Sequence, residues 1–222
     1  MKIDFRICLV TDRRQAAGGD ILGAIAAALD GGIRAVQLRE KDLGGRALFV
    51  LAERARRLTA GYGARLLVNG RPDVAAAVGA DGVHLGGDAI PAADARRLLG
   101  PEAIVGCSAH DLRELRGAEE GGADYATFGP VYATPSKAAY GPPAGIASLA
   151  EACRSSRVPV FALGGVGPEN VDELVGAGAY GIALISRVVS AADPRAAAAE
   201  LTARLARTRA KGPETGHPIE GR

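Results

Sequence analysis

The sequence predicts an α/β fold, a single (β/α)8 TIM barrel, and three observations lead to this prediction. Short apolar runs alternate with alanine-rich helical runs from Ile7 to about Arg207, and eight such pairs can be counted. The chain of 222 residues is long enough for a barrel of this kind without insertions. No Gly-x-Gly-x-x-Gly follows Val10, whereas a doubly wound dinucleotide-binding sheet would carry one there.

Eight short apolar runs predict the strands of the barrel. In chain order they are Ile7–Thr11, Ala35–Glu40, Arg65–Asn69, Gly82–Leu85, Ile104–Ala109, Tyr125–Val131, Pro159–Gly164 and Gly181–Ser186. A helical stretch follows each of them, so consecutive strands are expected to run parallel.

The stretches between the strands predict amphipathic helices, because their apolar residues recur three and four positions apart. In chain order they are Asp20–Asp30, Gly45–Ala60, Pro72–Val78, Ala92–Leu99, Asp111–Glu120, Gly145–Ser155, Pro168–Val175 and Pro194–Arg207. Several end in glycine, as at Gly31-Gly32 and Gly121-Gly122. A glycine just past a helix supplies the left-handed turn that reverses the chain into the next strand.

The domain organisation follows from the same patterns. No composition shift divides the chain, so residues 1–208 are predicted to form one barrel domain. Residues 209–222 are rich in Gly, Pro and Glu, lack periodicity, and are predicted to be a disordered C-terminal tail. With 48% hydrophobic and only 4% aromatic residues, the core is expected to depend on aliphatic packing.

Composition also narrows the class of protein. A formal net charge of +2 gives no reason to expect a nucleic-acid surface. We expect neither a secretory signal nor a membrane span, since no charged start precedes a long apolar stretch. Cys8, Cys107 and Cys153 have no metal-like spacing, and an odd number argues against a disulfide framework. These features predict a cytoplasmic protein, and Cys8 and Cys107, which lie in apolar, strand-like runs, are predicted to be buried and inert.

Polar residues follow the predicted strands, at the barrel end where catalytic groups are found. They are Gln37, Arg39 and Lys41 after strand two, Asn69 after strand three, Ser108 and His110 after strand five, and Thr134, Ser136 and Lys137 after strand six. Strand alternation places Gln37, Arg39 and Lys41 on one face. Inward cations are costly without an anion, so they indicate an anionic substrate. Alternatively, Glu40 and Asp42 neutralise them at a solvated rim.

The last two strands end in segments suited to a phosphate, Gly164-Gly165 and Ile185-Ser186. Backbone N–H groups freed by glycine, together with a helix N-terminus, favour a phosphate. Barrels commonly bind phosphate at these two loops. Alternatively, Gly164-Gly165 only makes a tight turn into the following helix.

Two histidines are candidates for proton transfer, because imidazole titrates near neutrality. His110 follows strand five and is the better candidate, although it could instead cap a helix or be structural. His84 lies within strand four, where a structural role is favoured over catalysis.

Several motifs together resemble the thiamine phosphate synthase and TenI-type superfamily, from about Leu9 to Leu205. They are Val36-Gln37-Leu38-Arg39-Glu40-Lys41, Val68-Asn69, Ala80-Asp81-Gly82-Val83-His84-Leu85-Gly86, Gly106-Cys107-Ser108-Ala109-His110, Phe128-Gly129-Pro130-Val131, Thr134-Pro135-Ser136-Lys137 and Leu163-Gly164-Gly165-Val166. Each is short, but their order and spacing are specific.

For a synthase, the resemblance implies two substrate sites. A pyrimidine pyrophosphate would be held by Gln37, Arg39, Lys41, Asn69, Ser108 and Lys137. A thiazole phosphate would meet Thr134, Ser136, Gly165, Ile185 and Ser186. Pyrophosphate would leave, and the thiazole nitrogen would attack the pyrimidine cation. Arg39 and Lys137 are then catalytic candidates, because they offset charge on the departing anion.

The resemblance fails at the magnesium ligands of the synthases. Gly70 stands where they have an aspartate, and their second aspartate falls on Ala89, one position past Asp88. We therefore predict no metal site, with Asp88 as the one candidate ligand and Mg²⁺ required only by a synthase. Asn69-Gly70 instead resembles the metal-independent TenI-type thiazole tautomerases, in which a residue at His110 would transfer the proton.

The sequence therefore favours a TenI-type thiazole tautomerase, an enzyme that binds a thiazole phosphate and uses acid/base catalysis without a metal. Retention of Gln37 and Lys41 keeps a thiamine phosphate synthase as the alternative. A third hypothesis is a non-catalytic regulator that binds thiazole phosphate. All three predict small phosphorylated ligands and no nucleic-acid or membrane partner, and they leave a homodimer open.

Overall fold

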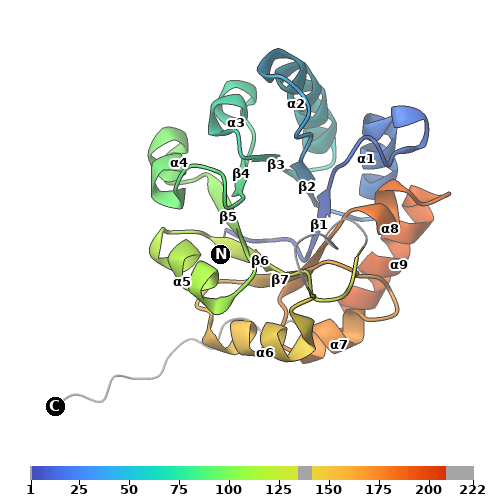
Figure 1. The fold of residues 1–222 in the computed structure, drawn as a ribbon. Coiled ribbons are helices and arrows are strands. Elements are labelled where there is room, and N and C mark those ends of the chain that lie inside the picture. Colours follow the sequence, from blue (N-terminus) through green and yellow to red (C-terminus); the bar gives the residue numbers. More distant parts are fainter. Residues whose placement is uncertain (1, 135–141, 209–222) are drawn as a thin grey trace.

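The computed structural model describes residues 2–134 and 142–208 of the chain. Eight parallel strands, hydrogen-bonded in chain order, form a closed barrel in which β8 pairs with β1. The helices form a ring around the strands (Figure 1). The predicted (β/α)8 barrel is thus confirmed. The disordered tail predicted for residues 209–222 lies outside the described residues.

The strands are short and agree closely with the predicted runs. They are β1 Ile7–Val10, β2 Ala35–Leu38, β3 Arg65–Asn69, β4 Gly82–Leu85, β5 Ile104–Ala109, β6 Tyr125–Phe128, β7 Val160–Leu163 and β8 Gly181–Leu184. Where a prediction differs, it is too long. The surplus residues, such as Thr11 and Glu40, belong to the loops at the barrel end, where Thr11 Oγ1 donates to Glu40 Oε1 at 2.7 Å.

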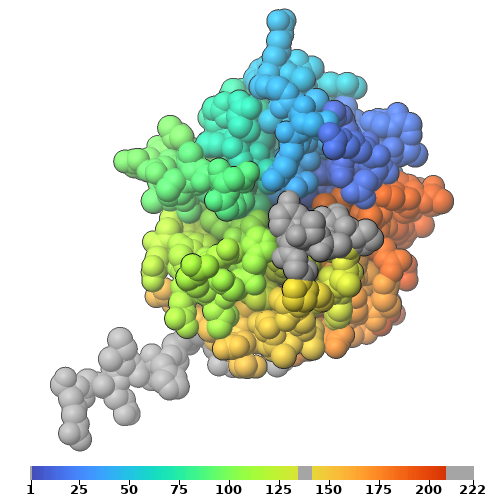
Figure 2. Space-filling view, viewed as in Figure 1, coloured from blue at the N-terminus to red at the C-terminus, as the bar shows by residue number. Residues whose placement is uncertain are grey.

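The helices pack around this barrel. They are η1 Ala17–Gly19, α1 Ile21–Asp30, α2 Gly45–Gly61, α3 Pro72–Val78, α4 Ala92–Leu99, α5 Leu112–Glu120, α6 Gly145–Ser155, α7 Val171–Gly176, α8 Ser186–Val189 and α9 Pro194–Arg207. The space-filling view shows their colours following one another around the molecule in chain order (Figure 2). Each β–α unit therefore lies beside its sequence neighbours.

The main differences from the predicted helices are at α7 and α8; η1 was not predicted either, and α1, α2 and α5 differ by one residue at one end. The helix expected from Pro168 begins only at Val171, because Asn170 forms a turn first: its Oδ1 accepts from Gly167 N at 3.0 Å and its Nδ2 donates to Gly165 O at 2.9 Å. The short helix α8 was not predicted. It begins at Ser186, directly after β8, so Ser186 belongs to a helix N-terminus and not to a strand.

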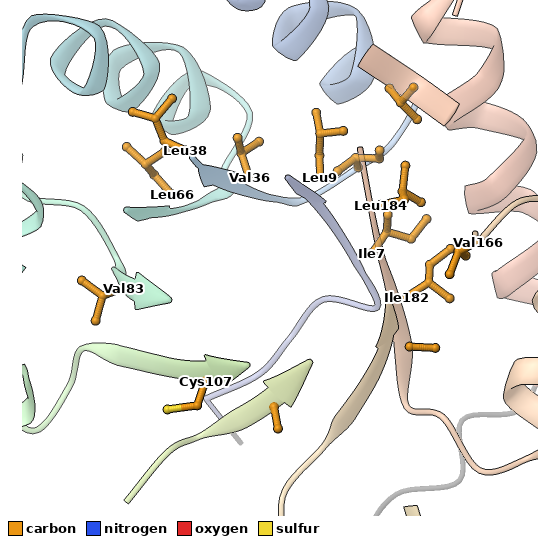
Figure 3. Packing of buried hydrophobic residues seen from close by; sticks show 14 of the residues in the cluster. Ile7, Leu9, Val36, Leu38, Leu66, Val83, Cys107, Val166, Ile182 and Leu184 are labelled. Atoms are coloured by element: carbon orange, nitrogen blue, oxygen red, sulfur yellow. The ribbon is translucent and has the colours of Figure 1, made fainter. Parts of the chain in front are cut away.

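Strand alternation separates two hydrophobic layers. One set of side chains faces the helices, including Ile7, Leu9, Val36 and Leu184 (Figure 3). The other set fills the barrel interior. It consists of Ile3, Phe5, Cys8, Val10, Ala35, Leu67, Ile104, Tyr125, Phe161 and Ala183. The expected reliance on aliphatic packing holds for the outer layer, whereas aromatic rings make up much of the interior.

The three cysteines are free, and burial raises the pKa of Cys8 to about 12 and of Cys107 to about 11. Both thiols are buried, as predicted, and stay protonated at neutral pH. Within the described ranges, no helix has both the length and the apolar character that crossing a membrane would need.

Candidate active site

Those polar residues of the predicted site that the structure describes lie at or just after the carboxyl ends of the strands, and because all eight strands are parallel these ends meet at one mouth of the barrel. Gln37 is buried with 3% exposure, and its Nε2 donates to Asn69 Oδ1 at 2.9 Å. These two amides, from β2 and β3, are therefore brought together as predicted. Their hydrogen bond leaves donor and acceptor capacity on each amide for a ligand.

The acids beside Arg39 are engaged by other cations. Glu40 is buried and accepts from Thr11 Oγ1 at 2.7 Å and from the backbone N of Arg13 at 3.1 Å, and its carboxylate lies 3.3 Å from Arg13 Nη1. Asp42 is bound by Arg13 at 2.5 Å and by Arg14 at 2.9 Å. The alternative in which Glu40 and Asp42 neutralise Arg39 and Lys41 is therefore wrong.

Arg39 and Lys41 follow β2, and in the described ranges neither forms an ion pair with Glu40 or Asp42. Within residues 2–134 and 142–208, Arg39 forms no ion pair, and Lys41 Nζ is 3.9 Å from Asp88 Oδ2 in a pair that is well exposed on both sides. Burial, and after it the charge of Arg39, lowers the pKa of His84 inside the barrel. The Arg39 backbone N is fixed by Thr11 Oγ1 at 2.9 Å.

A cavity of about 630 Å³ lies across the ends of β6, β7 and β8. It is lined by four predicted residues, Thr134, Gly165, Ile185 and Ser186. The backbone of Gly165 has φ +65°, and a Cβ there would lie 2.7 Å from Tyr132 Cβ. Glycine is thus required both for the turn and for close packing, so the exposed backbone of this loop stays accessible to a ligand.

Two polar side chains that line this cavity, those of Gln15 and Arg187, were not among the predicted site residues. Arg187 forms an ion pair with Glu169, and Gln15 Nε2 donates to Asp12 Oδ2 at 2.7 Å. Both follow the ends of strands, β1 and β8, so inspecting every β–α loop would have found them.

The two histidines occupy different environments. His110 is exposed at the start of α5, where Glu114 Oε2 lies 2.8 Å from its Nδ1 and also accepts its backbone N–H at 2.8 Å. His84 is buried, with Nδ1 2.9 Å from Tyr125 Oη and Nε2 3.0 Å from Ser108 Oγ. Burial lowers the pKa of His84 to about 3, so its imidazole is neutral. Ser108 therefore connects the mouth to a buried hydrogen-bond network.

The last predicted residues are two from the loop after β6 and the candidate metal ligand Asp88. Ser136 and Lys137 lie outside the described residues. Among those described, no group of three or more His, Cys, Asp or Glu side chains could hold a metal ion. Asp88 is 84% exposed, and at Gly70 an added Cβ would meet open space.

Comparisons with known proteins agree with this geometry. The family described as thiamine monophosphate synthase matches residues 7–188. A Geobacter sulfurreducens protein named "putative thiamine-phosphate synthase" is 54% identical, with 92% of this chain and 96% of that protein covered. The thiamine-phosphate synthase of Roseiflexus castenholzii is 44% identical, with coverage of 86% and 84%. The solved structure of a thiamine phosphate pyrophosphorylase from Pyrococcus furiosus is 35% identical and superposes with a TM-score of 0.83, covering 92% of this chain and 97% of that one.

Proposed function

Because the chain belongs to the thiamine monophosphate synthase family, we propose that this enzyme joins hydroxymethylpyrimidine pyrophosphate to a thiazole phosphate and releases pyrophosphate. The names of the relatives favour this alternative over the tautomerase that the sequence analysis preferred. One observation of the structure carries the proposal. Among the described residues Arg39 forms no ion pair, because Glu40 and Asp42 bind Arg13 and Arg14, and Lys41 has a long, exposed pair with Asp88 at 3.9 Å.

The two ends of the mouth suit two different anions. The cavity at Gly165 and Ser186 offers backbone N–H groups and a short helix start to the single phosphate of the thiazole. Arg39 and Lys41, with the Gln37–Asn69 amide pair, offer two cations and further donors to the more highly charged pyrophosphate. A second positive subsite is what a second, pyrophosphate-bearing substrate requires.

The proposed reaction breaks the bond between the pyrimidine methylene carbon and the pyrophosphate oxygen. Pyrophosphate leaves with the electron pair, and the thiazole nitrogen donates its lone pair to the methylene cation to form the new C–N bond. Arg39 and Lys41 offset the charge that builds on the departing oxygen. Lys137, outside the described residues, would add a third cation from the β6 loop.

Magnesium is the cofactor that the synthase reading implies. Asp88 Oδ2 lies 3.9 Å from Lys41 Nζ at this rim, and Gly70 has no side chain to offer. Mg²⁺ is commonly bound by one or two carboxylates together with substrate phosphates and water. The residues therefore fit an ion that arrives with the pyrophosphate and is held by Asp88, and not one held by the protein alone. When bound, the ion would supply positive charge beside the leaving group.

The test is formation of thiamine phosphate from the two purified substrates with Mg²⁺. Arg39→Met should lower kcat/KM by about 100-fold or more, in the range for losing one donor to a developing anion. Arg14→Met is the matched control, because Arg14 is 70% exposed and pairs with Asp42; it should retain the wild-type rate within about twofold. Absence of product at every magnesium concentration would refute the proposed function.

A further inference from the structure

A buried hydrogen-bond network spans three neighbouring strands beneath the mouth. His84 on β4 contacts Tyr125 Oη through Nδ1 at 2.9 Å and Ser108 Oγ through Nε2 at 3.0 Å, and Thr127 Oγ1 is 3.4 Å from Nε2. His84, Tyr125 and Thr127 are buried, whereas Ser108 is half-buried. Ser108 is therefore the member of the network that reaches the mouth.

Gly106 on β5 makes the central contact possible. The register pairs Gly106 with both His84 and Tyr125, so Gly106 lies between them. A Cβ at Gly106 would be 2.2 Å from the ring atoms of Tyr125 and 2.5 Å from its hydroxyl. The missing side chain thus allows the phenol to pass over β5 and reach the imidazole, so the network depends on this strand position.

The chemistry of the three groups selects one arrangement of protons. Burial raises the pKa of Tyr125 well above 10 and holds His84 neutral, so the phenol keeps its proton and only one imidazole nitrogen carries one. In the part of the chain that the structure describes, His84 Nδ1 is the single hydrogen-bond partner of Tyr125 Oη. A phenol is a stronger donor than an aliphatic hydroxyl, so the Tyr125 hydroxyl donates to Nδ1, and the proton of the imidazole is on Nε2.

We propose that His84 is a positioning residue, locked by Tyr125 in the Nε2–H tautomer so that Ser108 accepts from the imidazole and points its own O–H into the mouth. Ser108 then recognises an acceptor atom of the pyrimidine pyrophosphate. This inference rests on the proposed function for the identity of that substrate. Reversing the tautomer would turn the Ser108 proton inward and leave only lone pairs for the ligand.

The test is a double-mutant cycle in the synthase assay. Tyr125→Phe keeps the ring and removes the hydroxyl, and Ser108→Ala removes the hydroxyl at the mouth. Each should raise KM for the pyrimidine pyrophosphate by about three- to tenfold, the range for one hydrogen bond, with kcat and the KM for thiazole phosphate unchanged. The double variant should be no worse than Ser108→Ala.

A matched control is Tyr180→Phe, which removes a hydroxyl bonded to Ile3 O from the same aromatic cluster at the opposite end of the barrel. It should leave both KM values unchanged. If Tyr125→Phe behaves like Tyr180→Phe, or if its effect on KM multiplies with that of Ser108→Ala, the positioning role is refuted.

A readout that does not need turnover separates this inference from the proposed function. The ¹⁵N chemical shifts of the His84 ring report the tautomer in the free protein and should show Nε2–H in the wild type, with the Nε2–H population reduced in Tyr125→Phe. A wild-type Nδ1–H tautomer would overturn the proposal whether or not thiamine phosphate forms. Absence of product together with the Nε2–H tautomer would refute only the proposed function. The KM comparison would then be replaced by calorimetric measurement of hydroxymethylpyrimidine pyrophosphate binding to the wild type and to Tyr125→Phe.

Discussion

The buried, neutral His84 should make this protein lose stability at mildly acidic pH. Its pKa is lowered from 6.5 to about 3 by burial and by the charge of Arg39. Below pH 6.5 the unfolded chain takes up a proton on this residue, whereas the folded chain does not. The stability contribution is therefore present above pH 6.5 and is lost as pH falls towards 3.

The magnitude follows from the two protonation equilibria. For one group, each pH unit well below 6.5 lowers the free energy of unfolding by about 1.4 kcal/mol. Because the histidine of the unfolded chain is already half protonated at pH 6.5, the loss between pH 6.5 and 4.5 is about 2 kcal/mol. Carboxylates such as Asp4 and Asp172, whose pKa values are lowered by Arg65 and Arg204, take up protons mainly below this window, because their unfolded value is near 3.8. Glu169, whose pKa is lowered from 4.5 by its own backbone N–H and by Arg187, contributes within the window, so the histidine is isolated by comparison with a variant that lacks it.

The assay is urea unfolding at pH 6.5, 5.5 and 4.5 for the wild type and for His84→Gln, whose side chain cannot titrate. The variant is expected to be less stable at pH 6.5, because it loses part of the Tyr125–His84–Ser108 network. Its free energy of unfolding should then fall less steeply with acid than that of the wild type, by about 2 kcal/mol over the window. Parallel curves for the two proteins would refute the reasoning.

Three further predictions concern the mouth. Gly165→Ala should raise KM for thiazole phosphate by about tenfold or more in steady-state kinetics, because its Cβ would meet Tyr132 and its φ is +65°; an unchanged KM would exclude this loop from the phosphate site. Asp88→Asn should raise the Mg²⁺ concentration for half-maximal rate several-fold, and calorimetry of the wild type should detect Mg²⁺ binding only with pyrophosphate present; tight binding without pyrophosphate would contradict a substrate-borne ion. His110→Ala should keep the synthase rate within about twofold, since His110 is exposed and bonded to Glu114; a loss above tenfold would return it to the chemistry.

The sequence predicted the fold well because barrel strands and helices carry local signals. Gln37 and Arg39 alternate along one short strand segment, and Gly165 lies in one short turn. Their periodicity and turn chemistry can be read from a few consecutive residues, without knowing which other segments pack against them. The start of the helix at Val171 was predicted too early because the apolar spacing extends back to Pro168. In the structure, Asn170 Oδ1 accepts from Gly167 N and holds this segment in a turn, so the helix begins only after it.

The site was harder to predict, because partner choice is not local. Glu40 follows Arg39 in sequence, yet it bonds to Arg13 across the barrel rim, which only the β1–β2 pairing brings close. The role of His84 depends in the same way on Gly106, whose missing Cβ lets Tyr125 reach it. Neither relation has a signature within one strand.

Under the proposed function, the distribution of charge around the mouth would give the two substrates separate places. At the β7–β8 side, Arg187 is engaged by Glu169, so a phosphate there would be met mainly by backbone and hydroxyl groups. At the β2 side, Arg39 is freed because Arg13 binds the adjacent Glu40. A pyrophosphate carries more charge than a monophosphate and gains more from an unpaired guanidinium than from neutral donors. Under the proposed function, the acid pairing at the rim would direct the pyrimidine substrate to β2 and leave the thiazole phosphate at β7 and β8. Only β1 separates β8 from β2, so the nucleophile would approach from a neighbouring part of the mouth while the leaving group lies next to the cations.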